Sequence, residues 1–536
     1  MKKVLCIVLS LAMVLTLVAC GGTTSSSSDS SSSQSSSDSS STSTDSSSVA
    51  ETGRFDALQT TEEQVSLLID WHNFTPTPNT EPTEESPIVK KVVQTLTDQW
   101  LEDKPNVKVE WCHKGTEDEW LTVTYTAGVG PDTLFNYGGA ELVLDGWAIP
   151  LDEIVQSPNY YETGSPVWYD MFPEYVFEKG GMCRDDYDRI VSIPASLNPG
   201  PATAFYYNKD IFNELGLEPQ TDWDAFTEMV QTIREAGYVP IAPWGDPPEI
   251  TLTAWVATQF LTPLYSKTAS LDVADYDGDG VMSSQEKLRG IWEGKFYLEN
   301  NPALSELYDK VFYWFTDVLN EGYDSIDYTQ AWQNGEVAMK EDGLWALPGI
   351  ASDTKRKFDF GMFPWPGTVD SEYATEVTYT TGPYNPTVSV AFNVMDPKLQ
   401  DRPDYNVDYV VDWMKWMLTS ENLSMQVEEL NGEVIGAVKG CRVPGALKDW
   451  FTQQFPQMPL ESRPGRPNNV ESNEVEYKAM MEMVVKGMMT HDEWLKQHDE
   501  LMYKDIQMYV EQEQNKPDSE LDMTDWGELV APSWMA

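Results

Sequence analysis

The sequence predicts an α/β protein, and three observations support this fold class. Short apolar runs alternate with segments of helical periodicity through most of the 536 residues. The best-defined example is the stretch 205–240, where an aromatic strand is followed by two helical segments and a second strand. We interpret this stretch as a βαβ unit of a parallel sheet. A chain of this length exceeds what one hydrophobic core holds, so we expect two or three domains.

Each part of that stretch has its own local signal. The run 204–208, Ala-Phe-Tyr-Tyr-Asn, is apolar and aromatic, as expected of a buried strand. The helical segment 209–215 ends at Gly216, which suits a C-cap. Thr221 or Asp222 then caps a second helix, in which apolar residues recur with helical spacing.

The N-terminal half repeats the same alternation. Ligands of doubly wound sheets bind outside the carboxyl ends of the strands, so the loops after these strands are candidate binding segments. The predicted strands are 65–69, 107–111 and 131–135, with a helix at 87–100, and the loops are 70–74, 112–120 and 136–139.

The first 60 residues indicate export. Two lysines and an apolar run in residues 1–19 predict a signal peptide, and Leu17-Val18-Ala19-Cys20 resembles the lipobox of bacterial lipoproteins. That resemblance implies a diacylglycerol on Cys20; an ordinary signal peptide with an incidental cysteine is the alternative. Residues 20–60 are rich in Ser and are predicted to form a disordered tether.

Composition narrows the function classes. The chain has 35 Lys and Arg against 87 Asp and Glu, a formal charge of −52, which argues against nucleic acid as a partner. Cys112, Cys183 and Cys441 are an odd set, so one disulfide at most can form. Neither these cysteines nor the four histidines have the spacing of a catalytic or metal-binding motif.

Three segments resemble the extracellular solute-binding proteins of ABC importers, carbohydrate type (family 1), the group that includes maltose-binding protein. They are the run that begins YNKDIF at Tyr207, the run GEVAMKEDGLWAL at 335–347, and Gly130-Pro131-Asp132. The resemblance covers most of residues 64–460 in order. It implies a two-lobed periplasmic-binding-protein-like fold of type II, with a hinge and an interlobe cleft.

The domain organisation follows from that resemblance and from turn-forming segments. The Pro- and Gly-containing runs 194–203 and 379–386 are expected to cross between the lobes, and the resemblance places a third crossing near residue 450. We expect helices at 404–422 and 470–514. Lobe 1 is then 61–195 plus 385–450, and lobe 2 is 200–380 plus 455–536.

The segment 275–286 has the spacing of an EF-hand calcium loop. Oxygen donors stand at positions 1, 3, 5, 7, 9 and 12, and Gly280 stands at position 6. Carboxylates this close repel one another without a cation, so we expect a structural Ca²⁺, with an acidic surface turn as the alternative. The predicted ligands are Asp275, Asp277, Asp279, the Val281 carbonyl, Ser283 and Glu286.

Aromatic abundance indicates a carbohydrate ligand. The chain has 20 Trp and 25 Tyr, and sugar rings pack on aromatic faces while their hydroxyls bond carboxylates and amides. By the resemblance, Trp345 matches a sugar-stacking tryptophan of the family. Each candidate could instead be a core residue or a loop cap. The candidates are Trp71, Asn73, Asn136, Tyr137, Trp244, Asp246, Trp345 and Trp365.

We therefore expect a lipid-anchored, monomeric substrate-binding component of an ABC importer, on the extracellular face of a bacterial cytoplasmic membrane. It would capture a carbohydrate, an oligosaccharide, in the cleft and pass it to the permease subunits, without acting as an enzyme. Two alternatives remain. One is an extracellular glycoside hydrolase, which needs two carboxylates about 5–9.5 Å apart; the other is a glycan-binding surface protein without a transport role.

Overall fold

The computed structural model describes residues 53–81, 88–112, 118–135, 142–143, 146–179, 181–185, 187–198, 203–245, 271–319, 321–366, 370–374, 378–381, 388–396, 398, 402–457, 474–516, 519 and 521–535. The chain divides into two units, Met1–Glu51 and Thr52–Ala536, and the described residues belong to the second. The expected signal peptide, Cys20 and most of the tether lie outside the described residues. Within the described part, no helix combines the length and apolarity needed to cross a bilayer.

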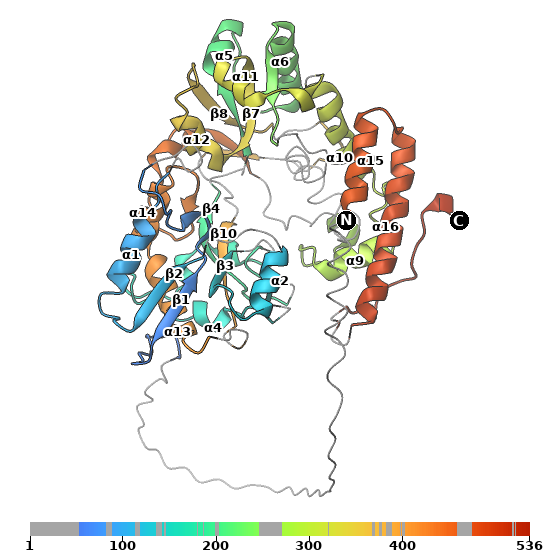
Figure 1. Ribbon diagram of the computed structural model, residues 1–536. Coiled ribbons are helices and arrows are strands. Elements are labelled where there is room, and N and C mark those ends of the chain that lie inside the picture. Colours follow the sequence, from blue (N-terminus) through green and yellow to red (C-terminus); the bar gives the residue numbers. More distant parts are fainter. Residues whose placement is uncertain are drawn as a thin grey trace, which may run out of the picture. The chain divides into compact units, whose positions relative to one another are not determined.

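Lobe 1, as we name it, is built on a mixed sheet of six strands in the order β11-β4-β10-β3-β1-β2 (Figure 1). β1 pairs in parallel with β2 and β3, whereas β10 is antiparallel to β3 and β4. The strands are β1 (Val65–Ile69), β2 (Val107–Trp111), β3 (Thr133–Phe135), β4 (Ile193–Leu197), β10 (Val388–Val394) and β11 (Ile435–Gly436). The helices include α1 (Val92–Trp100), α2 (Asp118–Thr126), α4 (Asp152–Val155), α13 (Val407–Met417) and α14 (Ser420–Glu429).

Lobe 2 is built on a sheet of four strands in the order β6-β7-β5-β8 (Figure 1). Phe205 of β5 anchors its core, with ring centroids 4.8 Å from Trp365 and 5.0 Å from Phe226. The strands are β5 (Thr203–Asn208), β6 (Val239–Ala242), β7 (Val337–Gly343) and β8 (Phe360–Pro364). The helices include α5 (Lys209–Leu215), α6 (Trp223–Glu235), α8 (Asp272–Ala274), α9 (Ser284–Trp292), α10 (Pro302–Tyr313), α11 (Tyr328–Asn334) and α12 (Leu347–Ser352).

The caps expected around α5 and α6 form. The Asn208 side chain accepts the N–H groups of Asp210 and Ile211 at the start of α5, and Gly216 ends that helix at φ 66°. Asp222 starts α6 by accepting the N–H of Ala225 at 3.0 Å.

The predicted βαβ unit is wrong in its topology. β7 lies between β5 and β6; β5 is antiparallel to β7 and β6 is parallel to it, so β5 and β6 run in opposite directions. The two helices expected between these strands are present, separated by the turn at Gly216. The handedness rule for parallel neighbours therefore does not apply to this connection.

The chain changes sheet at three places. It leaves the six-stranded sheet after β4 and enters the four-stranded sheet at β5; it returns between β8 and β10, and it leaves lobe 1 again after Trp450. The second and third crossings contain β9 (Thr378–Thr381) and β12 (Gln454–Gln457), which pair with each other as an antiparallel ribbon. Segments that connect the two sheets are thus hydrogen-bonded to one another.

The helical C-terminal segment packs on lobe 2. α15 (Glu474–Val485) and α16 (His491–Gln514) lie side by side, with α15 against α10 and α16 against α9 (Figure 1). Trp494 and His498 are buried, and the His498 ring bonds the Tyr308 hydroxyl at 3.1 Å and the Asp499 carboxylate at 3.0 Å. These contacts join the last helices to the core around α10.

One further expectation needs adjustment, and one question that the sequence left open is answered. The helix expected at 404–422 is interrupted, because Thr419 caps a new helix, α14, by accepting the N–H of Asn422. Cys112, Cys183 and Cys441 form no disulfide with one another.

Candidate ligand-binding cavity

A cavity of about 1120 Å³ is lined by residues of both lobes. Lobe 1 contributes Ile88, Lys90, Leu430 and Glu433, and lobe 2 contributes the ends of β6 and β7 with the segments that follow them. The volume slightly exceeds the range of about 300–1,000 Å³ for small-molecule sites, so a ligand of several rings has room.

Two tryptophans stand on the lobe 2 side. Trp244 follows β6 and Trp345 follows β7; both line the cavity, and they are 41% and 42% exposed. β6 and β7 are parallel, with Ala242 beside Lys340, so their carboxyl ends meet at one edge of the sheet. Large aromatic side chains this exposed suit a surface that a ligand covers.

Gly343 is needed for the placement of Trp345. A Cβ atom at Gly343 would lie 2.3 Å from Cε2 of the Trp345 ring. The Trp345 indole occupies the space beside Gly343, so any side chain there would displace the ring.

The lobe 1 wall is polar. The side-chain amide of Asn73 donates to Oε1 of Glu433 at 2.7 Å, and the Lys90 ammonium donates to the backbone carbonyl of Asn73 at 2.6 Å. Burial raises the pKa of Glu433 and lowers that of Lys90, although the two opposite charges partly offset these shifts. Asn73 is not itself a lining residue, but it orients Glu433, which is.

Backbone strain accompanies this polar wall. His72 and Asn431 have left-handed φ angles of 45° and 52°, and each lies one or two residues from a member of the Asn73–Glu433 pair. Such conformations persist where the surrounding structure fixes them, often at ligand sites.

The end of β7 carries a group of charges. Lys340 pairs with Asp342 at 2.7 Å, and both line the cavity. Between them lies Glu341, 3% exposed, whose Oε2 accepts the backbone N–H of Trp244 at 3.2 Å. Burial, with the nearby Asp342 charge, raises the pKa of Glu341 to about 8.

The structure does not bring two of the candidate tryptophans into the cavity. Trp71 continues the buried face of β1, stacks on Phe392 at 4.0 Å and donates Nε1 to Gln426, so it belongs to the lobe 1 core. Trp365 is 2% exposed and packs 4.8 Å from Phe205 and from Trp314 in the lobe 2 core. Asn136, Tyr137 and Asp246 lie outside the described residues.

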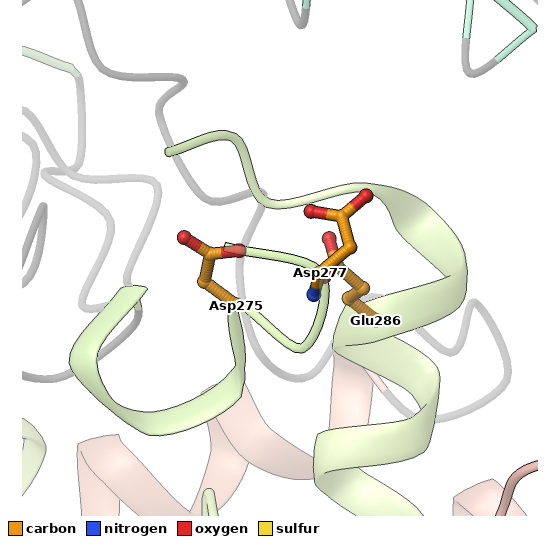
Figure 2. Close-up of side chains that lie close together, drawn as sticks. All are labelled: Asp275, Asp277 and Glu286. Carbon is orange, nitrogen blue, oxygen red and sulfur yellow. The ribbon is translucent and has the colours of Figure 1, made fainter. Parts of the chain in front are cut away.

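The acidic segment 275–286 runs from the end of α8 into the first turn of α9, and Figure 2 shows its side chains Asp275, Asp277 and Glu286. Carboxylate oxygens of Asp275, Asp277 and Glu286 lie within 4.8 Å of one another. Asp275 accepts the N–H groups of Gly278 and Gly280, and both glycines have positive φ angles, 75° and 82°. The loop therefore has the tight turn and the converging oxygens that a hard cation needs.

The other predicted calcium ligands have different partners. Asp279 forms an ion pair with Lys179 of lobe 1, and its Oδ1 accepts the N–H of Val281 at 2.8 Å. Ser283 caps α9 and bonds Glu286 in a reciprocal capping box.

Comparison with known proteins gives a family for the chain. Residues 79–423 match the family model described as bacterial extracellular solute-binding protein. The multiple sugar-binding protein of Streptococcus mutans is 26% identical over 179 residues, which are 33% of this chain and 39% of the relative. An uncharacterized ABC transporter extracellular-binding protein of Pyrococcus horikoshii is 25% identical over 297 residues, 52% of this chain and 59% of the relative. The chain thus spans less than two thirds of either curated relative.

Solved structures agree on the fold. A chitin oligosaccharide binding protein has a TM-score of 0.51 and 19% identity, covering 83% of this chain and 100% of that one. The apo form of RafE from Streptococcus pneumoniae has a TM-score of 0.51 and 16% identity, covering 83% and 98%. The expected two-lobed α/β fold class is confirmed, and because the family model matches well over half of its residues, the chain belongs to the family of bacterial extracellular solute-binding proteins.

Proposed function

We propose that the protein captures an oligosaccharide in the 1120 Å³ cavity and delivers it to the permease subunits of an ABC importer. The observation that carries this proposal is the pair of half-exposed tryptophans, Trp244 and Trp345, across from the polar wall of Lys90 and Glu433. Aromatic faces pack against sugar C–H groups, and carboxylates bond sugar hydroxyls. The names of a sugar-binding relative and of a chitin oligosaccharide binding neighbour support the same ligand class.

A thermal-shift screen tests this proposal. A ligand that binds only the folded protein raises stability by RT ln(1 + [L]/Kd), so a bound sugar raises the melting temperature in a concentration-dependent way. The panel contains maltotriose, raffinose, xylotriose and chitotriose, with amino acids as the contrasting class. A shift with amino acids and none with any saccharide would overturn the carbohydrate assignment.

In this proposal the protein binds without turnover. The four carboxylates that line the cavity have partners: Asp342 pairs with Lys340, Glu433 accepts from Asn73, Glu341 accepts from Trp244, and Asp353 accepts from Gln333. Chromatography of the bound saccharide after long incubation should return it uncleaved. Closure around the saccharide should also reduce the radius of gyration measured by small-angle scattering.

The proposal includes a membrane anchor. The tether expected at 20–60 ends earlier, because Phe55 is buried in the core and Arg54 pairs with Asp408. A lipid on Cys20 and the Ser-rich segment up to about residue 52 would hold a monomer close to the extracellular face of the membrane. A flexible chain of about 30 residues spans roughly 30 Å in root-mean-square terms, which leaves the binding unit free to reorient toward the permease.

We also propose a structural Ca²⁺ in the segment 275–286. Its ligands would be Asp275, Asp277, Asp279, the Val281 carbonyl, Ser283 and Glu286. The oxygen donor set and the turn at Gly280 fit a hard cation, and the bound ion would neutralise the clustered carboxylates. Asp279 would exchange Lys179 for the ion, and Glu286 would exchange its capping bonds for bidentate coordination.

A further inference from the structure

Glu341 is placed unusually for a carboxyl group. It is 3% exposed, it lines the cavity, and it lies directly opposite Phe205 of β5 in the sheet. The nearest cation along the strand, Lys340, is paired with Asp342 at 2.7 Å. Burying a carboxyl group is unfavourable unless hydrogen bonds compensate. The hydrogen bond that Glu341 accepts from the Trp244 N–H offsets part of this cost, so we ask what the buried carboxyl does for Trp244.

The hydrogen bond to Glu341 contributes to fixing the backbone position of Trp244. It is 41% exposed, so core packing covers only part of its surface, and the next residue, Gly245, has a φ of 94°. The backbone just beyond β6 has left the strand ladder, whose last pair is Ala242 with Lys340. The Glu341 carboxyl reaches across from β7 and holds the Trp244 N–H at 3.2 Å.

The geometry points to Glu341 as a positioning residue that fixes the Trp244 loop relative to Trp345 and thereby sets the affinity of the cavity. Glu341 lies near the end of β7, and Trp345 follows that strand four positions later, so one side chain links the two segments that carry the exposed indoles. The effect on affinity rests on the proposed function; the effect on the position of Trp244 does not.

The charge state of Glu341 supports this role. Groups on the neighbouring elements are Lys340 and Asp342 on β7, Tyr206 on β5, whose hydroxyl donates to the Gly343 carbonyl, and Tyr328 on α11. Burial raises the Glu341 pKa to about 8, so near pH 7 the group is mostly the neutral acid. A neutral glutamine can therefore replace it, keeping an oxygen that accepts from Trp244.

The first test needs no ligand. The full chain is labelled with 5-fluorotryptophan, and Trp244→Phe identifies the Trp244 signal in the ¹⁹F spectrum. Glu341→Met, which removes the acceptor at similar volume, should shift or broaden that signal, whereas Glu341→Gln should leave it in place. Glu433→Gln, at the half-buried carboxyl of the lobe 1 wall, is the matched control and should leave the Trp244 signal unchanged. An unchanged Trp244 signal in Glu341→Met would overturn the inference.

The second test measures affinity for maltotriose, raffinose, xylotriose and chitotriose. For the saccharides that bind, Glu341→Met should weaken binding about tenfold and Glu341→Gln less than about threefold, as expected for an interface anchor. In a Trp244→Ala background, Glu341→Met should cause less than about a twofold further loss, because its effect passes through Trp244. Equal losses in both backgrounds would overturn the role.

The remaining outcomes are also informative. If none of the four saccharides binds, the ¹⁹F result alone decides the role of Glu341, and the carbohydrate proposal is judged separately by the amino-acid arm of the thermal-shift screen. If Glu341→Met does not fold, the pH dependence decides it: the Trp244 signal of the natural protein should titrate near pH 8 and that of Glu341→Gln should not. A signal that is flat in both proteins would overturn the inference.

Discussion

Replacement of Trp345 by alanine separates ligand binding from folding. A tryptophan side chain buries about 150–250 Å² when fully covered. Because Trp345 is 42% exposed, a stacked saccharide can cover roughly 60–105 Å² of it. At about 25 cal/mol per Å², this area is worth ~1.5–2.6 kcal/mol, or a loss in affinity of roughly 12- to 80-fold.

The part of Trp345 that is already covered predicts a separate loss of stability. Roughly 85–145 Å² leaves the folded protein with the ring, an upper bound of ~2–3.6 kcal/mol in the free energy of unfolding. The matched control is Trp292→Ala, since Trp292 is also partly buried but lies on α9, away from the cavity lining. It should lower the melting temperature while leaving saccharide affinity unchanged.

The assays are isothermal titration calorimetry with a saccharide found in the thermal-shift screen, and urea unfolding for stability. If Trp345→Ala loses stability while its folded molecules bind with the original affinity, the ring is a packing residue and the stacking argument is wrong.

Three further predictions concern pH, metal and anchoring. The folded chain holds a proton on Glu341 up to about pH 8, whereas the unfolded chain releases it near pH 4.5. The free energy of unfolding should therefore fall as pH rises between these values, by up to about 1.4 kcal/mol per pH unit. Glu341→Gln should flatten this part of the plot of melting temperature against pH, and a plot identical to that of the natural protein would contradict the prediction. Chelation with EDTA should lower the melting temperature, and calcium should restore it better than magnesium. Glu286→Gln should reproduce much of the loss. A metal-free protein that melts at the same temperature as the calcium-treated one would refute the calcium site. Cys20→Ser should appear in the medium when cell fractions are blotted, and equal retention in the membrane fraction would remove the lipoprotein interpretation.

Local sequence signals located the elements well. The strands β1 and β2, the cap at Asp222 and the left-handed Gly216 follow from apolar runs and capping chemistry that involve neighbouring residues only. Strand order did not follow, because β7 joins the sheet beside β5 from more than a hundred residues away. The residue pattern of 205–240 holds no information about β7, a strand from another part of the chain that pairs between β5 and β6.

The segments that carried the family resemblance mainly serve the fold. Asp132 accepts the Leu68 N–H at 2.7 Å and pairs with Arg402 at 3.1 Å, which fastens β3 to β1. Gly335 ends α11 in the left-handed region. Trp345 is the exception, since it lines the cavity.

The polar wall could not be predicted from sequence. Glu433 lies 360 positions after its partner Asn73, and only the folded sheet brings them together. Trp71 had the same strand-end signal as Asn73, yet it continues the inward face of β1, whereas Asn73 lies in the 3-10 turn His72–Phe74, where the alternation of the strand has ended. Aromatic content alone does not distinguish the two.

The pairing of β9 with β12 has a mechanical consequence. Two separate crossings could each rotate independently. Two crossings joined by backbone hydrogen bonds behave as one two-stranded ribbon, which can bend perpendicular to its plane but resists sliding of one strand along the other. The register, from Gln454 beside Thr381 to Gln457 beside Thr378, must be kept throughout the motion, and Pro456 can donate no N–H to the ladder. The pairing therefore restricts how the two sheets can move relative to one another. An insertion in either β9 or β12 would shift the register of both strands and weaken this restriction.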